Sequence, residues 1–121
     1  MGCDIHASLE YKMSPEDTHY WLIARDIDID RRYGLFSRIA GVRGFSEPIA
    51  EPRGLPKGIA QEIKEEYEEW KEDGHSMSWL TARELTELED EYKQEPFYKT
   101  IVAYADKYGY ENVRLVFWFD N

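Results

Sequence analysis

This chain has only one cysteine. It also lacks a segment that resembles a signal peptide and any long apolar run. The single cysteine, Cys3, has no intramolecular disulfide partner, and no early segment joins a basic region to an apolar one as a signal peptide does. No apolar run approaches the length that crosses a bilayer. We therefore expect a protein of the reducing cytoplasm, with no membrane as its partner.

Positive charge is also in short supply. Fifteen Lys and Arg stand against 25 Asp and Glu, so the formal net charge is −10. Because affinity for nucleic-acid phosphates comes from cationic side chains, this balance disfavours bulk nucleic acid as a partner. The chain is 42% apolar and 15% aromatic, which is too much core material for a disordered protein. Its 121 residues suit a single domain over residues 1–121.

Signature motifs of common enzyme classes are missing as well. The sequence has no P-loop, no Gly-x-Ser-x-Gly, no His-Glu-x-x-His and no dinucleotide-binding fingerprint. Cys3 and His6 lie close together in a segment with strand character, where positions three apart diverge. A thiol enzyme is therefore not expected.

Three segments have the pattern of strands. Residues 3–12 alternate apolar and polar positions, and after a turn signal at residues 14–17 the alternation returns over residues 20–30. We predict that these two segments pair as an antiparallel hairpin. Residues 113–120 form the third predicted strand, and because both of its faces are largely apolar, it is expected to be central and covered on each side.

Four segments have helical spacing or helix-end signals, and we predict helices over residues 33–40, 59–70, 81–92 and 96–108. The first is expected to stop near Gly41 or Gly44, and the second at Gly74. Thr81 and Glu84 have the spacing of a capping box at the start of the third. Pro96 opens the fourth and Gly109 follows its end.

The fold predicted from these elements is α+β. It consists of a small antiparallel sheet, made of the N-terminal hairpin plus the C-terminal strand, packed with three to four helices on one face. Residues 45–57 contain three prolines and no hydrophobic period. They are predicted to form a long loop, and loops of this length often carry function.

Asp4, His6 and His75 are candidate catalytic or metal-binding residues. In a strand, Asp4 and His6 share one face about 7 Å apart, from a rise of ~3.3 Å per residue. With a donor from elsewhere, such as His75 or Asp120, they would suit a divalent metal, and either imidazole would suit a general base. The alternative is that Asp4 is solvated and His6 is a hydrogen-bonded surface residue. Spacing alone identifies no cofactor.

Arginine is concentrated between residues 25 and 53. This segment contains six of the eight arginines, no lysine and five acids, so it carries +1 while the remaining residues carry −11. Guanidinium groups match phosphate and carboxylate oxygens in bidentate geometry. Phosphate binding and pairing with acids of the chain itself are equally open. The candidate ligand-binding residues are Arg32, Arg38, Arg43, Arg53, Asp4, His6, His75 and Ser76.

Several sequence blocks together resemble a group of small bacteriophage and prophage proteins of unassigned activity that open with Met-Gly-Cys-Asp-Ile-His. These blocks are Met1–His6, Arg32-Tyr-Gly-Leu-Phe, Ala40-Gly-Val-Arg43, Pro52-Arg-Gly-Leu-Pro56, His75-Ser-Met-Ser-Trp-Leu80 and Val116-Phe-Trp-Phe-Asp-Asn121. The resemblance covers nearly the whole chain. It implies a phage or prophage source and a role in the cytoplasm of the host cell, and it brings no established catalytic residue.

Three functions follow as hypotheses. The first is a protein, expected to form a homo-oligomer, that binds and sequesters a nucleotide-derived signalling molecule and so counters host defence. The second is a metal- or His-dependent hydrolase or phosphodiesterase of such a nucleotide. The third is an acidic DNA mimic or inhibitor of protein interactions, because residues 61–92 are rich in acids.

Overall fold

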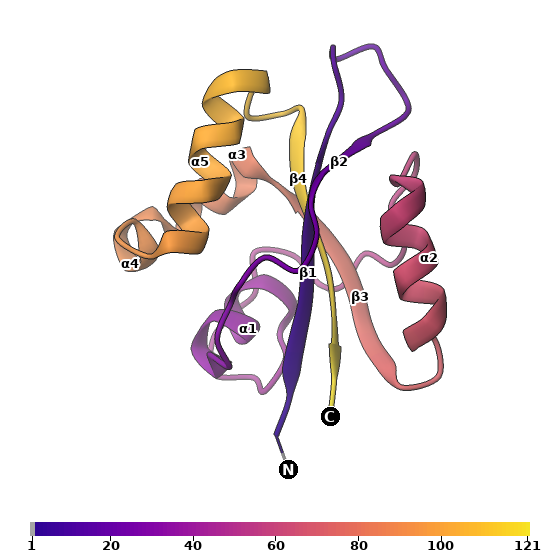
Figure 1. Ribbon diagram of the computed structural model, residues 1–121. Coiled ribbons are helices and arrows are strands. Elements are labelled where there is room, and N and C mark those ends of the chain that lie inside the picture. The colour runs from indigo at the N-terminus through magenta and orange to yellow at the C-terminus, as the bar shows by residue number, and fades with distance from the viewer. Residues whose placement is uncertain (1) are drawn as a thin grey trace.

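A four-stranded antiparallel sheet forms the centre of the computed structural model, which describes residues 2–121 (Figure 1). The strands are β1 (Asp4–Tyr11), β2 (Trp21–Ala24), β3 (Gly74–Thr81) and β4 (Val113–Asp120). Their order across the sheet is β2-β1-β4-β3. The predicted α+β class, with the hairpin and the C-terminal strand in one sheet, is confirmed.

The first and last strands, β1 and β4, lie side by side in the middle of the sheet. Their pairing runs without interruption from Asp4 opposite Asp120 to Tyr11 opposite Val113. Seven of the eight residues of β4 are buried. The apolar character of both faces of this segment thus correctly predicted a central, covered strand.

Helices cover both faces of the sheet. On the first, called the α1/α5 face, α1 (Tyr33–Ala40), α3 (Ala82–Leu85) and α5 (Pro96–Tyr108) share a core with β1 and β4. On the second, called the α2 face, α2 (Gln61–Trp70) packs through Ile63 against Val116 and Trp118. Figure 1 shows α2 on the opposite side of the sheet from α1 and α5.

The expectation that all helices pack on one face is therefore wrong. An amphipathic helix has to bury its apolar stripe against another element. In β4, the side chains of Val116 and Trp118 point away from the main core. They form the apolar surface against which α2 packs.

The helix ends follow the predicted signals. Gly41 ends α1 in the left-handed conformation (φ 72°), where its N–H donates to the Ser37 carbonyl. The Thr81 and Glu84 capping box is present at the start of α3. Pro96 opens α5, and the Gly109 N–H donates to the Ala105 carbonyl at the end of that helix.

Other boundaries differ from the predictions. Residues 81–92 form α3, the 3₁₀ turn η1 (Thr86–Leu88) and α4 (Glu89–Tyr92), not one helix. Strand β2 stops at Ala24, although the Ile27 N–H still donates to the Ala7 carbonyl of β1 at 2.7 Å. The prediction that the second helix ends at Gly74 is wrong, because α2 ends at Trp70 and Gly74 begins strand β3, which was not predicted. Among residues 2–121, no helix has the length and apolar character needed to span a bilayer.

Candidate functional site

The predicted site residues do not meet in one cavity. They are distributed over both faces of the sheet and over three separate cavities. The two imidazoles, of His6 and His75, lie on different faces of the sheet.

His6 lies on the α2 face, half-buried against two indoles. Its ring centroid is 4.3 Å from that of Trp70 and 5.7 Å from that of Trp118. Its Nε2 is 2.5 Å from Asp120 Oδ2, so the carboxylate of the neighbouring strand fixes the ring. Asp4 is exposed and accepts a hydrogen bond from Arg31 Nε at 3.0 Å. Asp4 and His6 thus have partners of their own.

His75 lies at the same end of the sheet but on the α1/α5 face. It pairs with Phe119 in the β3 and β4 register, whereas His6 pairs with Trp118. Successive strand residues point to opposite faces, and the two imidazoles accordingly contact different cores. His6 and His75 therefore do not form one metal site. Among residues 2–121, no three His, Cys, Asp or Glu side chains come together as a metal ion would require.

A cavity of about 440 Å³ unites three of the predicted residues, Arg43, His75 and Ser76, with Val42 and Asn121. We call it the His75 cavity. The guanidinium of Arg43 lies 4.7 Å from the centroid of the Tyr33 ring. Nearby Cys3 is fully buried, and desolvation raises the pKa of its thiol.

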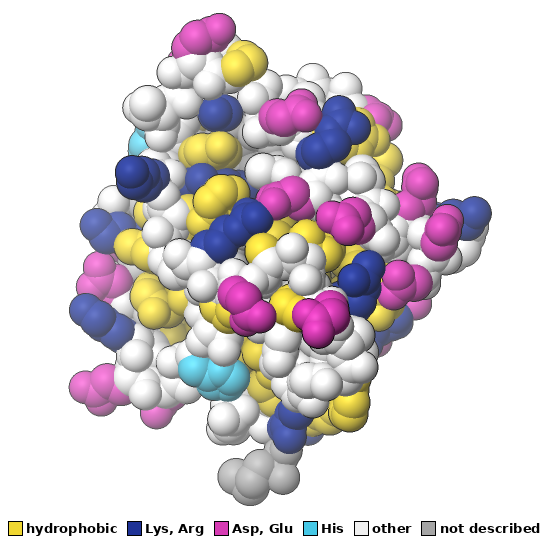
Figure 2. Space-filling view, turned by 180° about the vertical axis from the view of Figure 1, so that it is seen from behind, with side chains coloured by type: hydrophobic (Ala, Val, Ile, Leu, Met, Phe, Trp, Pro, Cys, Tyr) yellow, Lys and Arg dark blue, Asp and Glu magenta, His cyan; other side chains and the backbone are white. Residues whose placement is uncertain are grey.

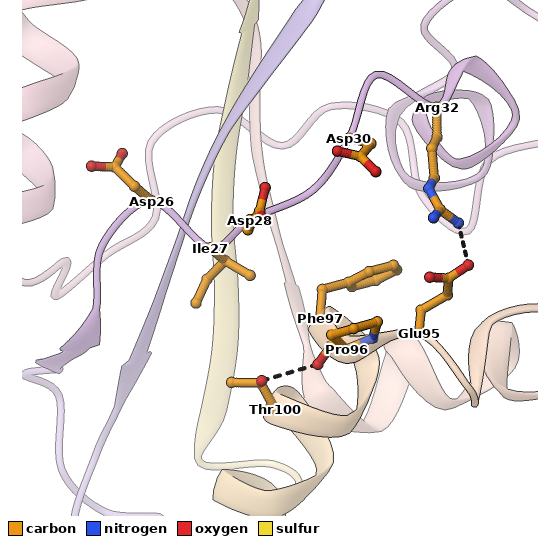
Figure 3. A pocket seen from close by; sticks show the side chains of 9 residues that line it. All are labelled: Asp26, Ile27, Asp28, Asp30, Arg32, Glu95, Pro96, Phe97 and Thr100. Atoms are coloured by element: carbon orange, nitrogen blue, oxygen red, sulfur yellow. Dashed lines mark hydrogen bonds and ion pairs between the residues drawn. The ribbon is translucent and has the colours of Figure 1, made fainter.

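Arg32 and Arg38 are paired with acids of the chain. Arg32 Nη1 is 2.5 Å from Glu95 Oε1, at the rim of a cavity of about 300 Å³ that also contains Asp26, Asp28 and Asp30 (Figure 3). Arg38 lies 3.6 Å from Glu91 and donates to the Glu47 carbonyl at 3.4 Å. For these two arginines, the structure therefore agrees with the hypothesis that they pair with acids of the chain itself.

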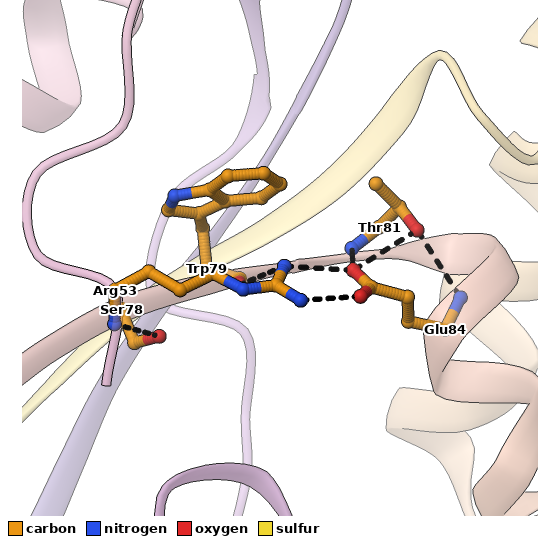
Figure 4. A network of polar contacts seen from close by, with 5 residues as sticks. All are labelled: Arg53, Ser78, Trp79, Thr81 and Glu84. Atoms are coloured by element: carbon orange, nitrogen blue, oxygen red, sulfur yellow. Dashed lines mark hydrogen bonds and ion pairs between the residues drawn. The ribbon is translucent and has the colours of Figure 1, made fainter. Parts of the chain in front are cut away.

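Arg53 stands at the rim of the largest of these cavities and is fixed on three sides (Figure 4). Both terminal nitrogens of its guanidinium donate to the Glu84 carboxylate, and Nη1 also donates to the Trp79 carbonyl at 3.1 Å. The guanidinium carbon lies 4.5 Å from the centroid of the Trp79 indole. Hydrogen bonding to Arg53 lowers the pKa of Glu84 below its ordinary value of 4.5.

This cavity, called the Trp79 cavity, has a volume of about 740 Å³ and brings together four Lys or Arg side chains with one carboxylate, Asp17. The loop before α2, the hairpin connection and the adjoining ends of β3 and β4 supply its lining. The lining residues are Lys12, Asp17, Thr18, His19, Tyr20, Arg53, Leu55, Pro56, Lys57, Gly58, Trp79 and Arg114.

A buried ion pair supports the floor of the Trp79 cavity. Arg114 of β4 donates through Nε to Glu10 of β1, and both residues are almost fully buried. Arg114 Nη2 donates to the Lys57 carbonyl at 2.7 Å, and the guanidinium carbon lies 3.5 Å from the centroid of the Tyr20 ring. Burial raises the pKa of the Glu10 carboxyl, and the adjacent Arg114 charge opposes that rise.

The same Glu10 holds the start of α2 in place. Its Oε1 accepts a hydrogen bond from the Ala60 N–H at 2.8 Å, which satisfies an amide that the first helical turn leaves without a partner. Gly58, just before it, has φ 70°, and its carbonyl accepts a hydrogen bond from the Tyr20 N–H at 2.8 Å. The hairpin connection and the loop before α2 are thereby joined directly across the cavity.

Of the eight predicted ligand-binding residues, only Arg53 lines the Trp79 cavity. Lys12, Lys57 and Arg114 were missed, because each looks like an ordinary polar position in its own segment. Two predictions pointed there: Arg53 was a candidate from the arginine-rich segment, and the last residues of the predicted long loop, residues 45–57, form part of the lining.

Comparisons with known proteins add no assignment. No family model matches the chain, and neither a curated protein nor a solved structure is significantly similar to it.

Proposed function

We propose that this protein binds a small phosphate-bearing molecule of the nucleotide class in the Trp79 cavity. The observation that carries the proposal is the local charge: two lysines and two arginines, each arginine paired with a carboxylate behind it, line this cavity with one acid, Asp17, in a chain whose net charge is −10. A concave site with cations at its wall attracts anions despite an acidic surface elsewhere. Its volume of about 740 Å³ lies in the range of small-molecule sites.

The lysines are assigned the phosphate contacts. Glu84 already occupies the two terminal nitrogens of Arg53, and Glu10 and the Lys57 carbonyl occupy two nitrogens of Arg114. Lys57 is exposed, and Lys12 reaches over the Tyr20 ring with its ammonium 5.5 Å from the ring centroid. Because Glu84 and Glu10 neutralise the two arginines, Lys12 and Lys57 are the cations that face the phosphates.

Apolar and aromatic surface beside these charges suits the rest of a nucleotide. Leu55 is 46% exposed, and Trp79 is half-buried with part of its indole on the cavity. An indole next to a cationic wall is the usual combination for a base and its phosphates. The site therefore favours a ligand with one flat apolar part and one anionic part.

Sequestration is the action we assign to this binding, as a phage-type protein that withholds a nucleotide signal from host defence. The proposal is supported by the resemblance to phage proteins, because one of the blocks that carries it, residues 52–56, contributes Arg53, Leu55 and Pro56 to the cavity lining. A DNA mimic is less well supported, since Figure 2 shows basic and hydrophobic side chains interspersed with the acids on the face in view.

Isothermal titration calorimetry with cyclic dinucleotides, ADP-ribose and nucleoside diphosphates tests the proposal. We expect at least one of them to bind, and the double variant Lys12→Gln with Lys57→Gln to weaken that binding by roughly 100-fold. Each charged contact is worth about 1.5 kcal/mol, which is roughly tenfold in affinity.

The double variant Lys93→Gln with Lys99→Gln is the matched control, because both are exposed lysines outside this cavity. It removes two positive charges, as the test variant does, and should leave the affinity unchanged. Silence across the whole panel would refute the proposal, and so would an equal loss of affinity in the control.

A further inference from the structure

Strand β3 is irregular at the point where it carries Ser76. The register between β3 and β4 shifts between His75 and Ser78, and Ser76 adopts φ 57°, a left-handed conformation that non-glycine residues rarely occupy. Bulges re-aim side chains next to active sites, and backbone strain of this kind gathers where function requires it. The irregularity therefore draws attention to what the Ser76 hydroxyl contacts.

That hydroxyl forms the first link of a hydrogen-bonded chain. Ser76 Oγ is 2.9 Å from His75 Nδ1, and His75 Nε2 is 3.3 Å from Asn121 Oδ1. An amide oxygen only accepts hydrogen bonds, so the proton of a neutral imidazole resides on Nε2. Nδ1 is then the basic nitrogen, and it accepts the proton of the serine hydroxyl.

The surroundings hold this chain in place and add a positive charge. The His75 ring lies 6.0 Å from the Phe119 ring in a nearly parallel arrangement. The His75 cavity in front of the hydroxyl is lined by Val42 and Arg43, and Arg43 also has a positive φ of 72°. A hydroxyl, an imidazole, an amide and a guanidinium thus line one cavity of about 440 Å³.

We propose that Ser76 and His75 form the nucleophile and general base of a site that hydrolyses small carboxylic esters. Ser76 Oγ attacks the carbonyl carbon while its proton moves to His75 Nδ1, and Arg43 stabilises the negative oxygen that forms. The carbon–oxygen bond to the alcohol then breaks, and the alcohol leaves with the proton from His75. Water then gives a proton to His75 and attacks the acyl carbon, the bond between that carbon and Ser76 Oγ breaks, and Ser76 takes the proton back from His75 as the acid leaves. Asn121 is a positioning residue that fixes the tautomer.

This site is independent of the proposed binding function, because none of the residues that line the His75 cavity lines the Trp79 cavity. Failure of one proposal leaves the other standing.

Labelling with diisopropyl fluorophosphate tests the site directly. The serine oxygen bonds to phosphorus as the phosphorus–fluorine bond breaks, fluoride leaves and the proton passes to His75. We expect one adduct per chain by intact-mass spectrometry, mapped to Ser76 by peptide sequencing. Wild-type protein should also hydrolyse p-nitrophenyl acetate.

Ser76→Gly is the decisive variant, because glycine adopts the positive φ of Ser76 without strain while the nucleophilic hydroxymethyl group is lost. It should fold at least as well as the wild type and lose both the adduct and the ester hydrolysis. Ser46→Ala, which alters an exposed serine outside this cavity, should be labelled like the wild type.

Two further variants separate base from positioning residue. His75→Gln should slow labelling by roughly 100-fold, the usual contribution of general-base catalysis. Asn121→Leu should slow it about tenfold, and Asn121→Asp, which keeps an acceptor for Nε2, should restore the rate. Absence of an adduct on the wild type, an adduct at another residue, or unchanged labelling of Ser76→Gly would overturn the proposal.

Discussion

The two faces of the sheet are both covered by helices but are held together by different contacts. On the α1/α5 face the buried residues of β1 and β4 are apolar, among them Leu9, Leu115 and Phe117. On the α2 face an ion pair, Glu10 with Arg114, lies beside Val116 and Trp118. The first face is specified by hydrophobic burial, whereas the second places charge next to the Trp79 cavity.

The comparison shows where this small protein tolerates polar groups in its interior. A buried ion pair loses hydration energy that its mutual attraction only partly restores, so it contributes little net stability. The ion pair does hold both charges in fixed positions. Glu10 also binds the Ala60 amide, and Arg114 binds the Lys57 carbonyl. The α2 face therefore has a smaller apolar core than the α1/α5 face, and its buried ion pair forms a rigid polar floor under the cavity.

The largest expected effect comes from breaking that ion pair on one side. Arg114→Met leaves Glu10 buried without its cation, and we expect the free energy of unfolding to fall by about 3–5 kcal/mol. The double variant Glu10→Met with Arg114→Met should recover part of that loss, because it removes the unpaired charge but leaves the Ala60 amide and the Lys57 carbonyl without these partners. Urea denaturation followed by circular dichroism measures both.

Arg83→Met is the control for this comparison. Arg83 pairs with Glu111 at 3.1 Å, but both side chains are more than half exposed. Its loss should change the free energy of unfolding by about 0.5 kcal/mol or less. An Arg114 variant as mild as the Arg83 variant would remove the distinction between the two faces.

Matched truncations on α5 and α2 measure how much each apolar core contributes to stability. Ile101→Ala on α5 and Ile63→Ala on α2 each remove a fully buried side chain, and each should cost about 2–5 kcal/mol by urea denaturation. We expect the Ile101 variant to lose more, because Ile101 belongs to the larger of the two apolar cores. A larger loss at Ile63 would contradict this ranking.

Gly58→Ala tests the junction at the cavity wall. A Cβ at this position would lie 1.8 Å from the Thr18 carbonyl oxygen, and the φ of 70° is itself unfavourable for alanine. We expect a loss of about 1–3 kcal/mol in thermal unfolding, together with weaker nucleotide binding in calorimetry, because the hairpin connection has to move. Gly44→Ala, also at positive φ but with open space around its Cβ, isolates the backbone contribution.

The smallest effect concerns pH. Arg53 lowers the pKa of Glu84, so this carboxylate stabilises the folded state above its ordinary pKa of 4.5, and the stabilisation disappears as the pH falls through the lowered value. Glu84→Gln should therefore show a shallower loss of stability below pH 4.5 than the wild type. Melting temperatures between pH 3 and 7 provide the measurement, and parallel curves for the two proteins would refute this role of Glu84.

Local patterns in the sequence predicted the elements that depend on local physics. Alternation predicted β1 and β4, and the signals at Gly41, Pro96 and Gly109 matched the helix ends. Strand β3 was missed for two reasons. Its register shift after His75 interrupts the alternation of apolar and polar residues. Gly74, which follows a Glu-rich helix, also has the pattern of a helix end.

The site was less accessible to sequence reasoning, because its residues meet only through the sheet. Glu10 and Arg114 are separated by 104 positions, and each looks like an ordinary polar position of its own strand. The arginine cluster was correctly identified as a feature, but acids from distant segments, such as Glu95 and Glu84, satisfy Arg32 and Arg53. Spacing along the chain does not reveal such partners.

The central position of β1 and β4 has a consequence for how the chain folds. His6 and Asp120 contact each other across 114 positions, and every residue of β1 has its partner in β4. Closing so long a loop is entropically slow, and proteins dominated by distant contacts fold slowly. During synthesis, the edge of β1 that pairs with β4 therefore stays unpaired until β4 has left the ribosome. Refolding of the full chain should be slower than that of helical proteins of the same size.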